Sequence, residues 1–544
     1  MRVQTSLMAV ILFGGSLAWC DQGHHHAVTE EEVGSVHFST SCSKALGRSF
    51  NRAVALLHSF QYEQSRQAFA ELSGQDPKCA MVQWGVAMSH YHGLWGNGDM
   101  AAGRNALHRA ETIARDNPKT TAREMGYIDA LAEIYREDGK DNAAHAHAFE
   151  QKMATVHAEY PSDREAAVFH ALALAVSAPK TDKTFSNQRR CGEILEPIFA
   201  KYPQHPGITH YIIHCYDNPV LASKGLGAAR MYAKIAPASA HANHMPSHIF
   251  TRLGLWDESI SANLKSAGLA AKDESASING EARDQRLHAM DYLEYAYLQS
   301  GRVKQATSVL REMNALQPVA GVTLTGDYAL AAIPARYAIE LGDWKQASGL
   351  KVNPDSVSWA QAITWAAIGV GSAHSGSLDR ATQAENKLAS VRDSIAKQGN
   401  IYWSNQVEVQ RREVSAWIAE EGDRGTNAIA MIRSAAELEE SMDKDAVTPG
   451  PVTPAREMLA QMLLLEKRPR QSLTEYEAVL KVSPNRFNAL YGAASAADAS
   501  GLPSAANRYV QKLTEIAIGD ERPELVAARK KIAVTSQNAS PTRP

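Results

Sequence analysis

The amino-acid sequence predicts an all-α protein, a superhelical solenoid of about nine to eleven helix hairpins. Three observations lead to this prediction. A pattern of four residues recurs with the same spacing near both ends of the chain, and a glycine marks a repeated turn between helices. The sequence between these markers is rich in strong helix formers with apolar residues at helical spacing, and no convincing strand alternation appears.

The recurring pattern consists of two small residues, an aromatic residue and a proline. Intervals of 12, 4 and 8 residues separate the members of two sets, Ala53, Ser65, Phe69 and Pro77, and Ala460, Ser472, Tyr476 and Pro484. Small residues let paired helices approach closely, the aromatic ring fills the gap to the next hairpin, and the proline ends the second helix. The pattern therefore predicts stacked helix hairpins.

The repeated turn is a glycine followed five residues later by a small residue. It occurs four times, as Gly254 with Ser259, Gly301 with Ala306, Gly342 with Ala347, and Gly376 with Ala381. The intervals between these glycines are 47, 41 and 34 residues. The basic unit is therefore about 34 residues long, with inserted loops in some units.

Together these positions resemble the pattern of tetratricopeptide repeat (TPR) proteins over most of the chain. The stretch from His210 to Ile260 is also similar to a group of exported bacterial TPR proteins of undefined role. The resemblance implies a concave groove, lined by the first helix of each hairpin, where ligands usually bind. It implies no particular function, because TPR arrays commonly serve as scaffolds for peptides or partner proteins.

Composition and repeat markers divide the chain into seven segments. We expect a signal peptide at 1–18, a poorly ordered lead-in at 19–44, an N-terminal TPR-like array with a histidine-rich groove at 45–317, a middle array at 318–442, a Pro/Gly loop at 443–454, C-terminal TPR repeats at 455–532, and a disordered tail at 533–544. The Pro/Gly loop should break the array before its last two repeats.

The beginning of the chain predicts export. Arg2, the apolar run from Leu7 to Phe13 and the small residues that follow are typical of a secretory signal peptide, which places the protein in the periplasm. The sequence from Leu17 to Cys20 loosely resembles a lipoprotein cleavage box, so a lipid anchor at Cys20 is an alternative. No later apolar run reaches the roughly 18 residues of a membrane span.

The charge balance excludes two classes of partner. The chain has 56 basic and 59 acidic residues without a long run of one sign, which argues against nucleic acid and against a polybasic membrane contact. A protein, a peptide or a small molecule in the concave groove is the expected partner.

The cysteines that follow Cys20 predict two disulfides. Four cysteines in an oxidising compartment allow three pairings, and sequence proximity favours Cys42 with Cys79 and Cys191 with Cys215. The alternative is four buried thiols.

Histidine is concentrated in the first half of the array, with 14 of the 20 histidines between residues 90 and 288. Counting back thirteen, ten and six residues from Gly254 reaches His241, His244 and His248, which share one helical face. The same count from Gly301 reaches His288, Asp291 and Tyr295, and in the preceding unit it reaches His210 and His214. The equivalent positions counted from Gly342 and Gly376 contain no histidine.

This histidine face suggests a transition-metal site. Neutral imidazole is a common ligand of zinc, copper and iron, and residues four apart on a helix can present two rings together. Asp217 and Asp291 could supply a carboxylate or orient a ligand imidazole. Pro246 leaves one question open, because His241 and His244 would fall in a loop if a helix began there.

Other side chains expected in the groove are Trp84, Met88, Tyr91, His92, Arg252, Tyr295 and Arg336. Core packing is the alternative for the aromatic and methionine residues among them. Arg252 and Arg336 could hold an anionic ligand if they face the groove.

The sequence thus predicts an exported TPR scaffold with a histidine-lined groove that binds a protein, a peptide or a small ligand, with or without a metal. The alternative is a metal-dependent enzyme that uses the same histidine and aspartate cluster as ligands. The standard short catalytic motifs do not occur in the chain.

Overall fold

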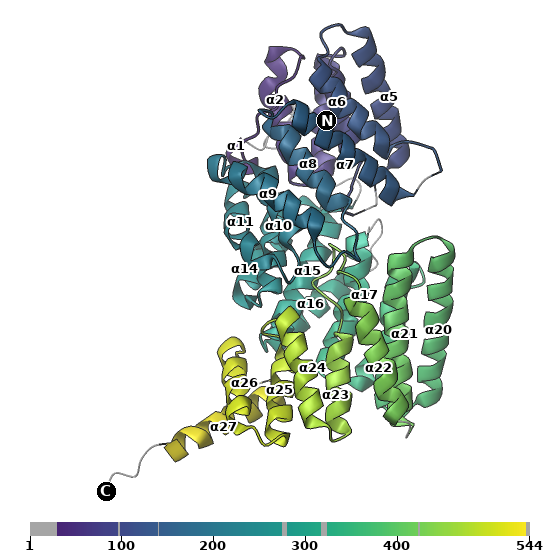
Figure 1. Ribbon diagram of the computed structural model, residues 1–544, viewed down its shortest axis with the longest axis vertical. Helices are drawn as coiled ribbons and strands as arrows, with labels where there is room; N and C mark the ends of the chain where they lie inside the picture. Colours follow the sequence, from purple (N-terminus) through teal and green to yellow (C-terminus); the bar gives the residue numbers. More distant parts are fainter. Residues whose placement is uncertain are drawn as a thin grey trace, which may run out of the picture.

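The computed structural model describes residues 30–95, 98–139, 141–274, 280–316, 324–422, 425–519 and 521–539. All regular structure in these ranges is helical, which confirms the all-α solenoid (Figure 1). The predicted signal peptide, Cys20 and its lipid anchor lie outside the described residues.

The helices follow one another along the array from the purple N-terminal end to the yellow C-terminal end of Figure 1. The first part contains α1 (Glu30–Val33), η1 (Lys44–Leu46), α2 (Gly47–His58), α3 (Tyr62–Gln75), α4 (Ala80–Met88), α5 (Met100–Asp116), α6 (Ala122–Ile134), α7 (Asn142–Glu159), α8 (Arg164–Val176) and α9 (Ser186–Lys201). The middle part contains α10 (Pro206–Tyr216), α11 (Ala222–Ile235), α12 (Ala240–His244), α13 (Pro246–Arg252), α14 (Trp256–Asp273), α15 (Glu281–Gln299), α16 (Val303–Ala315), α17 (Leu324–Glu340) and α18 (Trp344–Ser348). The last part contains α19 (Ser358–His374), α20 (Leu378–Lys397), α21 (Ile401–Glu421), α22 (Gly425–Glu440), α23 (Ala455–Leu465), α24 (Pro469–Val482), α25 (Phe487–Ala499), α26 (Pro503–Ile516) and α27 (Pro523–Ala539).

Consecutive helices pair into hairpins from α2 with α3 to α25 with α26. When α12 and α13 are taken together as one first helix, the described residues form twelve hairpins, one more than the upper expected number.

The small residues of the repeat pattern form the seams between paired helices. Ala53, Ser65, Ala460 and Ser472 are fully buried. The hydroxyl of Ser65 donates to the carbonyl of Ala53 at 3.0 Å, and that of Ser472 donates to the carbonyl of Ala460 at 2.7 Å. The first and last repeats therefore share the same helix contact.

The aromatic residue of the pattern packs against a glycine of the next helix. A Cβ atom at Gly85 would overlap the ring of Phe69, and one at Gly492 would overlap the ring of Tyr476. The turn glycines also have a conformational role, since Gly254 and Gly301 have φ angles of +65° and +71°, where a side chain is disfavoured.

Replacing Ala460 by tryptophan should destabilise the C-terminal repeats by about 1 to 3 kcal/mol or more, because the seam has no room for an indole. Urea unfolding followed by circular dichroism measures the loss. Thr474→Trp, on the exposed side of α24, is the matched control and should change the free energy of unfolding little. Equal stability of the Ala460 variant and the native chain would contradict the seam.

Both expected cysteine pairs are present as disulfides. Cys42 is bonded to Cys79 and Cys191 to Cys215, with Cα–Cα distances of 5.1 and 6.3 Å. The first ties the segment before α2 to the start of α4, and the second joins α9 to α10. Across the described ranges, no helix combines the length and hydropathy that a membrane span requires.

The two ends of the array differ from the expected segments. The lead-in is packed from Val33 onward, and its Phe38 ring lies 5.0 to 5.6 Å from the rings of Phe50, Trp84 and Tyr127. These apolar side chains complete the core of the first hairpins. At the other end, α27 extends beyond residue 532, where the tail was expected to begin, to Ala539.

The Pro/Gly loop, residues 443–454, folds back into the middle of the array (Figure 1). Tyr292 on α15 donates to the carbonyl of Thr448 at 2.8 Å, and Tyr328 on α17 donates to the carbonyl of Gly450 at 3.1 Å. Val447 is fully buried. The loop therefore connects α22 to α23 and also fastens the C-terminal repeats to the histidine-rich part.

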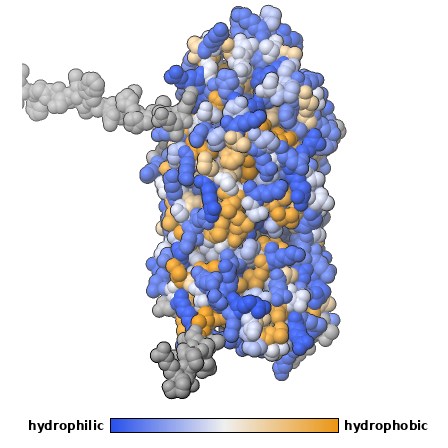
Figure 2. Space-filling model, turned by 60° about the vertical axis from the view of Figure 1, so that its left-hand side comes forward, coloured by the Kyte–Doolittle hydropathy of each residue, from blue (hydrophilic) through white to orange (hydrophobic). Residues whose placement is uncertain are grey.

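The face seen in Figure 2 has apolar side chains along its middle, bordered by hydrophilic ones.

Candidate metal centre

The helix that carries three of the histidines is kinked at Pro246. Helix α12 ends at His244 and α13 begins at Pro246, while Met245 between them keeps helical φ and ψ angles of −51° and −37°. Proline lacks the amide hydrogen that would continue the helical hydrogen bonding. The kink leaves His241 and His244 in helical structure, which settles the open question about Pro246.

The structure brings six of the predicted histidines together in two adjacent triads. In each triad the candidate ligand atoms all lie within 4.8 Å of one another; the first triad is His210, His214 and His241, and the second is His244, His248 and His288. The ring centroids of His214 and His248 lie 6.0 Å apart, so the triads are neighbours. The side chains come from α10, α12, α13 and α15 and are buried, with His214 partly so. They line an interior site and not an open groove.

In the second triad two imidazole lone pairs face each other. The Nε2 atoms of His244 and His248 are 3.0 Å apart. His244 Nδ1 lies 2.7 Å from the side-chain oxygen of Asn263, and His248 Nδ1 lies 2.8 Å from the Asp217 carboxylate. Both oxygens can only accept, so each Nδ1 carries the hydrogen and each neutral ring has its lone pair on Nε2. A cation between the two Nε2 atoms would remove this repulsion.

The amide orientation of Asn263 supports this assignment. Its Nδ2 donates to the carbonyl of Ser259 at 2.8 Å, which leaves Oδ1 facing His244. The helix seam at Ser259 therefore determines which nitrogen of His244 is protonated.

In the first triad a hydrogen-bond partner fixes the lone pair of one of the two facing nitrogens, that of His210. His210 Nδ1 donates to the backbone carbonyl of His58 at 2.6 Å, and its Nε2 lies 3.1 Å from Nε2 of His241. The Nε2 atom of His214 is buried and has no hydrogen-bond partner among the described residues. An unpaired buried nitrogen is costly unless something occupies the space before it.

The environment keeps these imidazoles uncharged. Burial, helped by the neighbouring imidazoles, lowers the pKa of His210 to about 3 and the pKa values of His214 and His241 well below the ordinary value. Burial likewise lowers the pKa of His244 and of His288 well below the usual range. Neutral imidazole is the form that binds metals.

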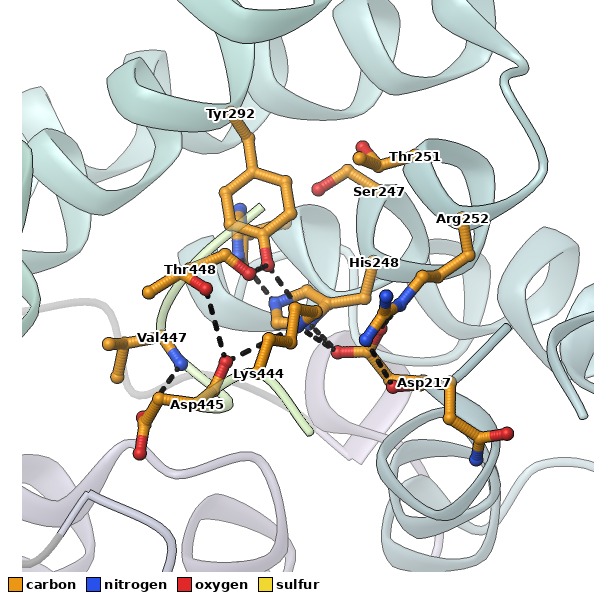
Figure 3. A network of polar contacts seen from close by, with 12 residues as sticks. Asp217, Ser247, His248, Thr251, Arg252, Tyr292, Lys444, Asp445, Val447 and Thr448 are labelled. Atoms are coloured by element: carbon orange, nitrogen blue, oxygen red, sulfur yellow. Dashed lines mark hydrogen bonds and ion pairs between the residues drawn. The ribbon is translucent and has the colours of Figure 1, made fainter. Parts of the chain in front are cut away.

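Asp217 links the second triad to the Pro/Gly loop, as Figure 3 shows. Its carboxylate accepts from His248, from Lys444 Nζ at 2.6 Å and from Arg252 Nε at 3.0 Å. Although burial opposes ionisation, Lys444 and Arg252 hold the pKa of Asp217 well below its usual value. A fixed carboxylate behind a ligand histidine orients the ring and makes it a better ligand.

Asp291 does not join the histidines. Its carboxylate forms a buried ion pair with Arg336 Nη1 at 2.6 Å, and the same nitrogen contacts Glu294 at 2.9 Å. This corrects two expectations, since Asp291 is not placed as a metal ligand and Arg336 does not face an open groove. Both groups are fully buried and neutralise each other's charge.

The other expected groove residues separate into two sets. Trp84 and Met88 are buried in the core of the first hairpins, Tyr91 packs against that core, and His92 stacks on Tyr62 at 4.0 Å between ring centroids. Core packing, the alternative weighed for these residues, describes their place. Arg252 and Tyr295 instead border a large cavity near the second triad.

A third group, His58, Glu165 and His205, also has metal-ligand atoms within 4.8 Å of one another. Here the polar atoms are already satisfied. The Glu165 carboxylate accepts from His58 Nε2 at 3.0 Å and from His205 Nε2 at 2.8 Å, while Tyr211 lies 2.9 Å from the other nitrogen of His58. This group is structural, and it positions the His58 carbonyl that holds His210.

Three contributors to the site were absent from the sequence prediction. Tyr292 follows His288 by one helical turn, so its place on the same face could have been inferred. Asn263 lies on the second helix of the hairpin. Lys444 is 227 residues from Asp217, and no local pattern relates the two.

The chain was compared with known proteins. No protein-family model matches it, and the search of curated proteins found no match. Among solved structures, that of Ypp1 shares 8% identity over 86% of this chain and 81% of that chain, with a TM-score of 0.46. The human IFIT1 dimer with PPP-AAAA shares 13% identity over 86% of this chain and 89% of that chain, with a TM-score of 0.34. Likeness at this level carries no argument about function.

The depressed imidazole pKa values predict that acid destabilises the metal-free protein. In the unfolded chain a histidine takes up a proton near pH 6.5, whereas these buried rings stay neutral to lower pH. Each such histidine should therefore remove up to about 1.4 kcal/mol of stability per pH unit below about 6.5. Urea unfolding at pH 7.5 and 5.5 after metal removal measures the effect, and unchanged stability would contradict buried neutral histidines.

Proposed function

We propose that this protein binds one or two transition-metal ions through its two histidine triads. The single observation that carries the proposal is the pair of Nε2 atoms of His244 and His248, which lie 3.0 Å apart. In both rings Nδ1–H donates a hydrogen bond to an oxygen, so both Nε2 atoms carry a lone pair. A proton between them would be an alternative, but burial lowers the pKa of both rings. A metal cation fits the space better.

The distances support this proposal. Metal–imidazole bonds of about 2.0 to 2.1 Å in a tetrahedral site place ligand nitrogens about 3.3 Å apart. The closest nitrogen pairs of the two triads are 3.0 and 3.1 Å apart. A shift of a few tenths of an ångström would bring either pair to this separation, and the third candidate ligand nitrogen of each triad lies within 4.8 Å of the other two.

Imidazole-only ligand sets suit copper, zinc and iron. The Nδ1 hydrogens of His210, His244 and His248 are already held by a carbonyl, an amide and a carboxylate, the usual supports of metal-bound histidine.

A metal-dependent enzyme is the second candidate. Three protein ligands per ion leave a coordination position open, as in catalytic and not structural sites. Tyr292 stacks on His248, with ring centroids 4.8 Å apart, and places a phenol beside the triad. A peptide or protein ligand for the histidines is less well supported, because their side chains are buried.

We also propose that the protein works in the periplasm. The two disulfides support an oxidising compartment, as do the signal-like residues at the beginning of the sequence and the similarity of His210 to Ile260 to exported bacterial TPR proteins.

Titration of metal-free protein with Co²⁺ tests the proposal, because cobalt in a low-symmetry nitrogen site has visible absorption. The tract His24 to His26 could bind metal independently, so the titrated chain should carry alanine at these three positions. We expect saturable absorption bands at one or two equivalents of cobalt. If only the chain with the intact tract shows the bands, or if binding is not saturable, the proposal is contradicted.

A further inference from the structure

A large cavity borders the Asp217 network. Its volume is about 920 Å³, and it is lined by residues of α13, α15, α17, α19 and α21 to α24, by the segments that precede α9 and α11, and by the Pro/Gly loop. Arg252, Lys444 and Thr448 belong both to its wall and to the network in Figure 3. None of the triad histidines lines it, so the cavity is distinct from the candidate metal site.

Most of the cavity wall suits a flat apolar molecule. Tyr295, Tyr328, Tyr402 and Trp403 contribute aromatic surfaces. Trp403 is held by stacking on Trp359, with ring centroids 4.2 Å apart. Aliphatic side chains complete the wall, including Ile363, Val370, Val409 and Val452. A cavity of this size and lining can enclose most of a small organic ligand.

The charged groups at one end of the cavity favour an anion. Arg252, Lys444 and Lys183 lie there with two carboxylates, Asp217 and Asp443. Two further carboxylates nearby have cationic partners of their own, since Glu440 pairs with Arg456 and Asp445 with Lys180. Within the described residues Lys183 has no ion-pair partner, and its ammonium donates to the carbonyl of Met442 at 2.7 Å. This end of the cavity therefore has one positive charge in excess.

Two other carboxyl groups of the cavity wall have raised pKa values. They belong to Glu413 and Glu439, and burial together with their mutual repulsion raises the pKa of Glu413 well above its usual value. Burial also raises the pKa of Glu439 to about 7. A protonated carboxyl group there can donate a hydrogen bond and does not repel an anion.

We propose that this cavity is a second ligand site, which binds a small aromatic anion with its ring system among the tyrosines and Trp403 and its acidic group towards Lys183, Arg252 and Lys444. The site needs no bound metal, so it stands or falls independently of the metal centre. Excess positive charge at one end of an aromatic cavity is the observation that selects this class of ligand over a neutral one.

A pair of fluorescent probes tests the proposal on the metal-free full-length protein. 8-Anilinonaphthalene-1-sulfonate has an aromatic body and one anionic group, whereas N-phenyl-1-naphthylamine has nearly the same body without the charge. We expect saturable one-site binding of the anionic probe, with affinity about tenfold or more above that of the neutral probe. Equal affinities, or no saturable binding, would overturn the proposal.

Two substitutions locate the binding. Lys183→Met should lower the affinity for the anionic probe about three- to tenfold, because it removes a positive charge from the cavity mouth. The affinity for the neutral probe should not change. Lys265→Met, at an exposed lysine of α14, is the matched control and should change neither. Ala366→Trp should fill the cavity and abolish binding of both probes, with folding checked by circular dichroism. Full binding to a folded Ala366→Trp protein, or no effect of Lys183→Met, would place the probes elsewhere and contradict the proposal.

Discussion

Replacing His244 and His248 together by alanine should abolish metal binding at the second triad. The substitution removes two of three ligands and the pair of facing lone pairs that makes the site receptive to a cation. A metal present at about a thousand times its dissociation constant stabilises the native protein by about 4 kcal/mol, and this increment should disappear. Calorimetry with and without metal measures both the binding and the increment.

The matched control is His108→Ala with His147→Ala, two exposed histidines outside both triads. This variant should retain the full metal-induced rise in melting temperature. If the His244 and His248 double variant binds metal like the native chain and only loses stability without metal, the histidines are structural and the site assignment fails.

Asp217→Asn is expected to have the second largest effect. The substitution leaves Lys444 without its buried counter-charge and Arg252 with Asp443 alone, and breaking a buried ion pair typically costs about 3 to 5 kcal/mol. It also removes the carboxylate behind His248, so metal affinity should fall about 10- to 100-fold. Denaturant unfolding of the metal-free protein and metal titration measure these two effects separately.

Lys444→Met in the Asp217→Asn background distinguishes an unpaired charge from a general loss of packing. Because it removes one unpaired charge, the double variant should be more stable than the sum of the two single changes predicts. Strict additivity, or unaltered metal affinity in Asp217→Asn, would show that the network does not support the site.

The fold was predictable because its signals are local and repeated. Ala53 with Ser65 and Ala460 with Ser472 make the same contact at the two ends of the array. The residues that repeat in the sequence are therefore the residues that pack the helix pairs together. Counting from Gly254 and Gly301 also placed His244 and His288 on one face, since hairpins in the same register present equivalent residues to the same side.

What the sequence could not show depends on distant segments. The count from the turn glycine places Asp291 beside His288, but the ion pair with Arg336 turns its carboxylate away. Lys444 reaches Asp217 only because the Pro/Gly loop folds back into the array. The TPR resemblance implied an open groove. The same loop, with Val447 buried, packs into the array where that groove was expected.

Metal analysis of the untagged protein, purified from its native compartment, tests the central claim most directly. Mass spectrometry of the bound elements should find one or two equivalents of copper, zinc or iron, and X-ray absorption at that metal's edge should show nitrogen neighbours at about 2.0 Å with the scattering pattern of imidazole. The same analysis of His244→Ala with His248→Ala should show loss of the metal bound at the second triad. Native protein that contains no metal and acquires none on titration would contradict the account.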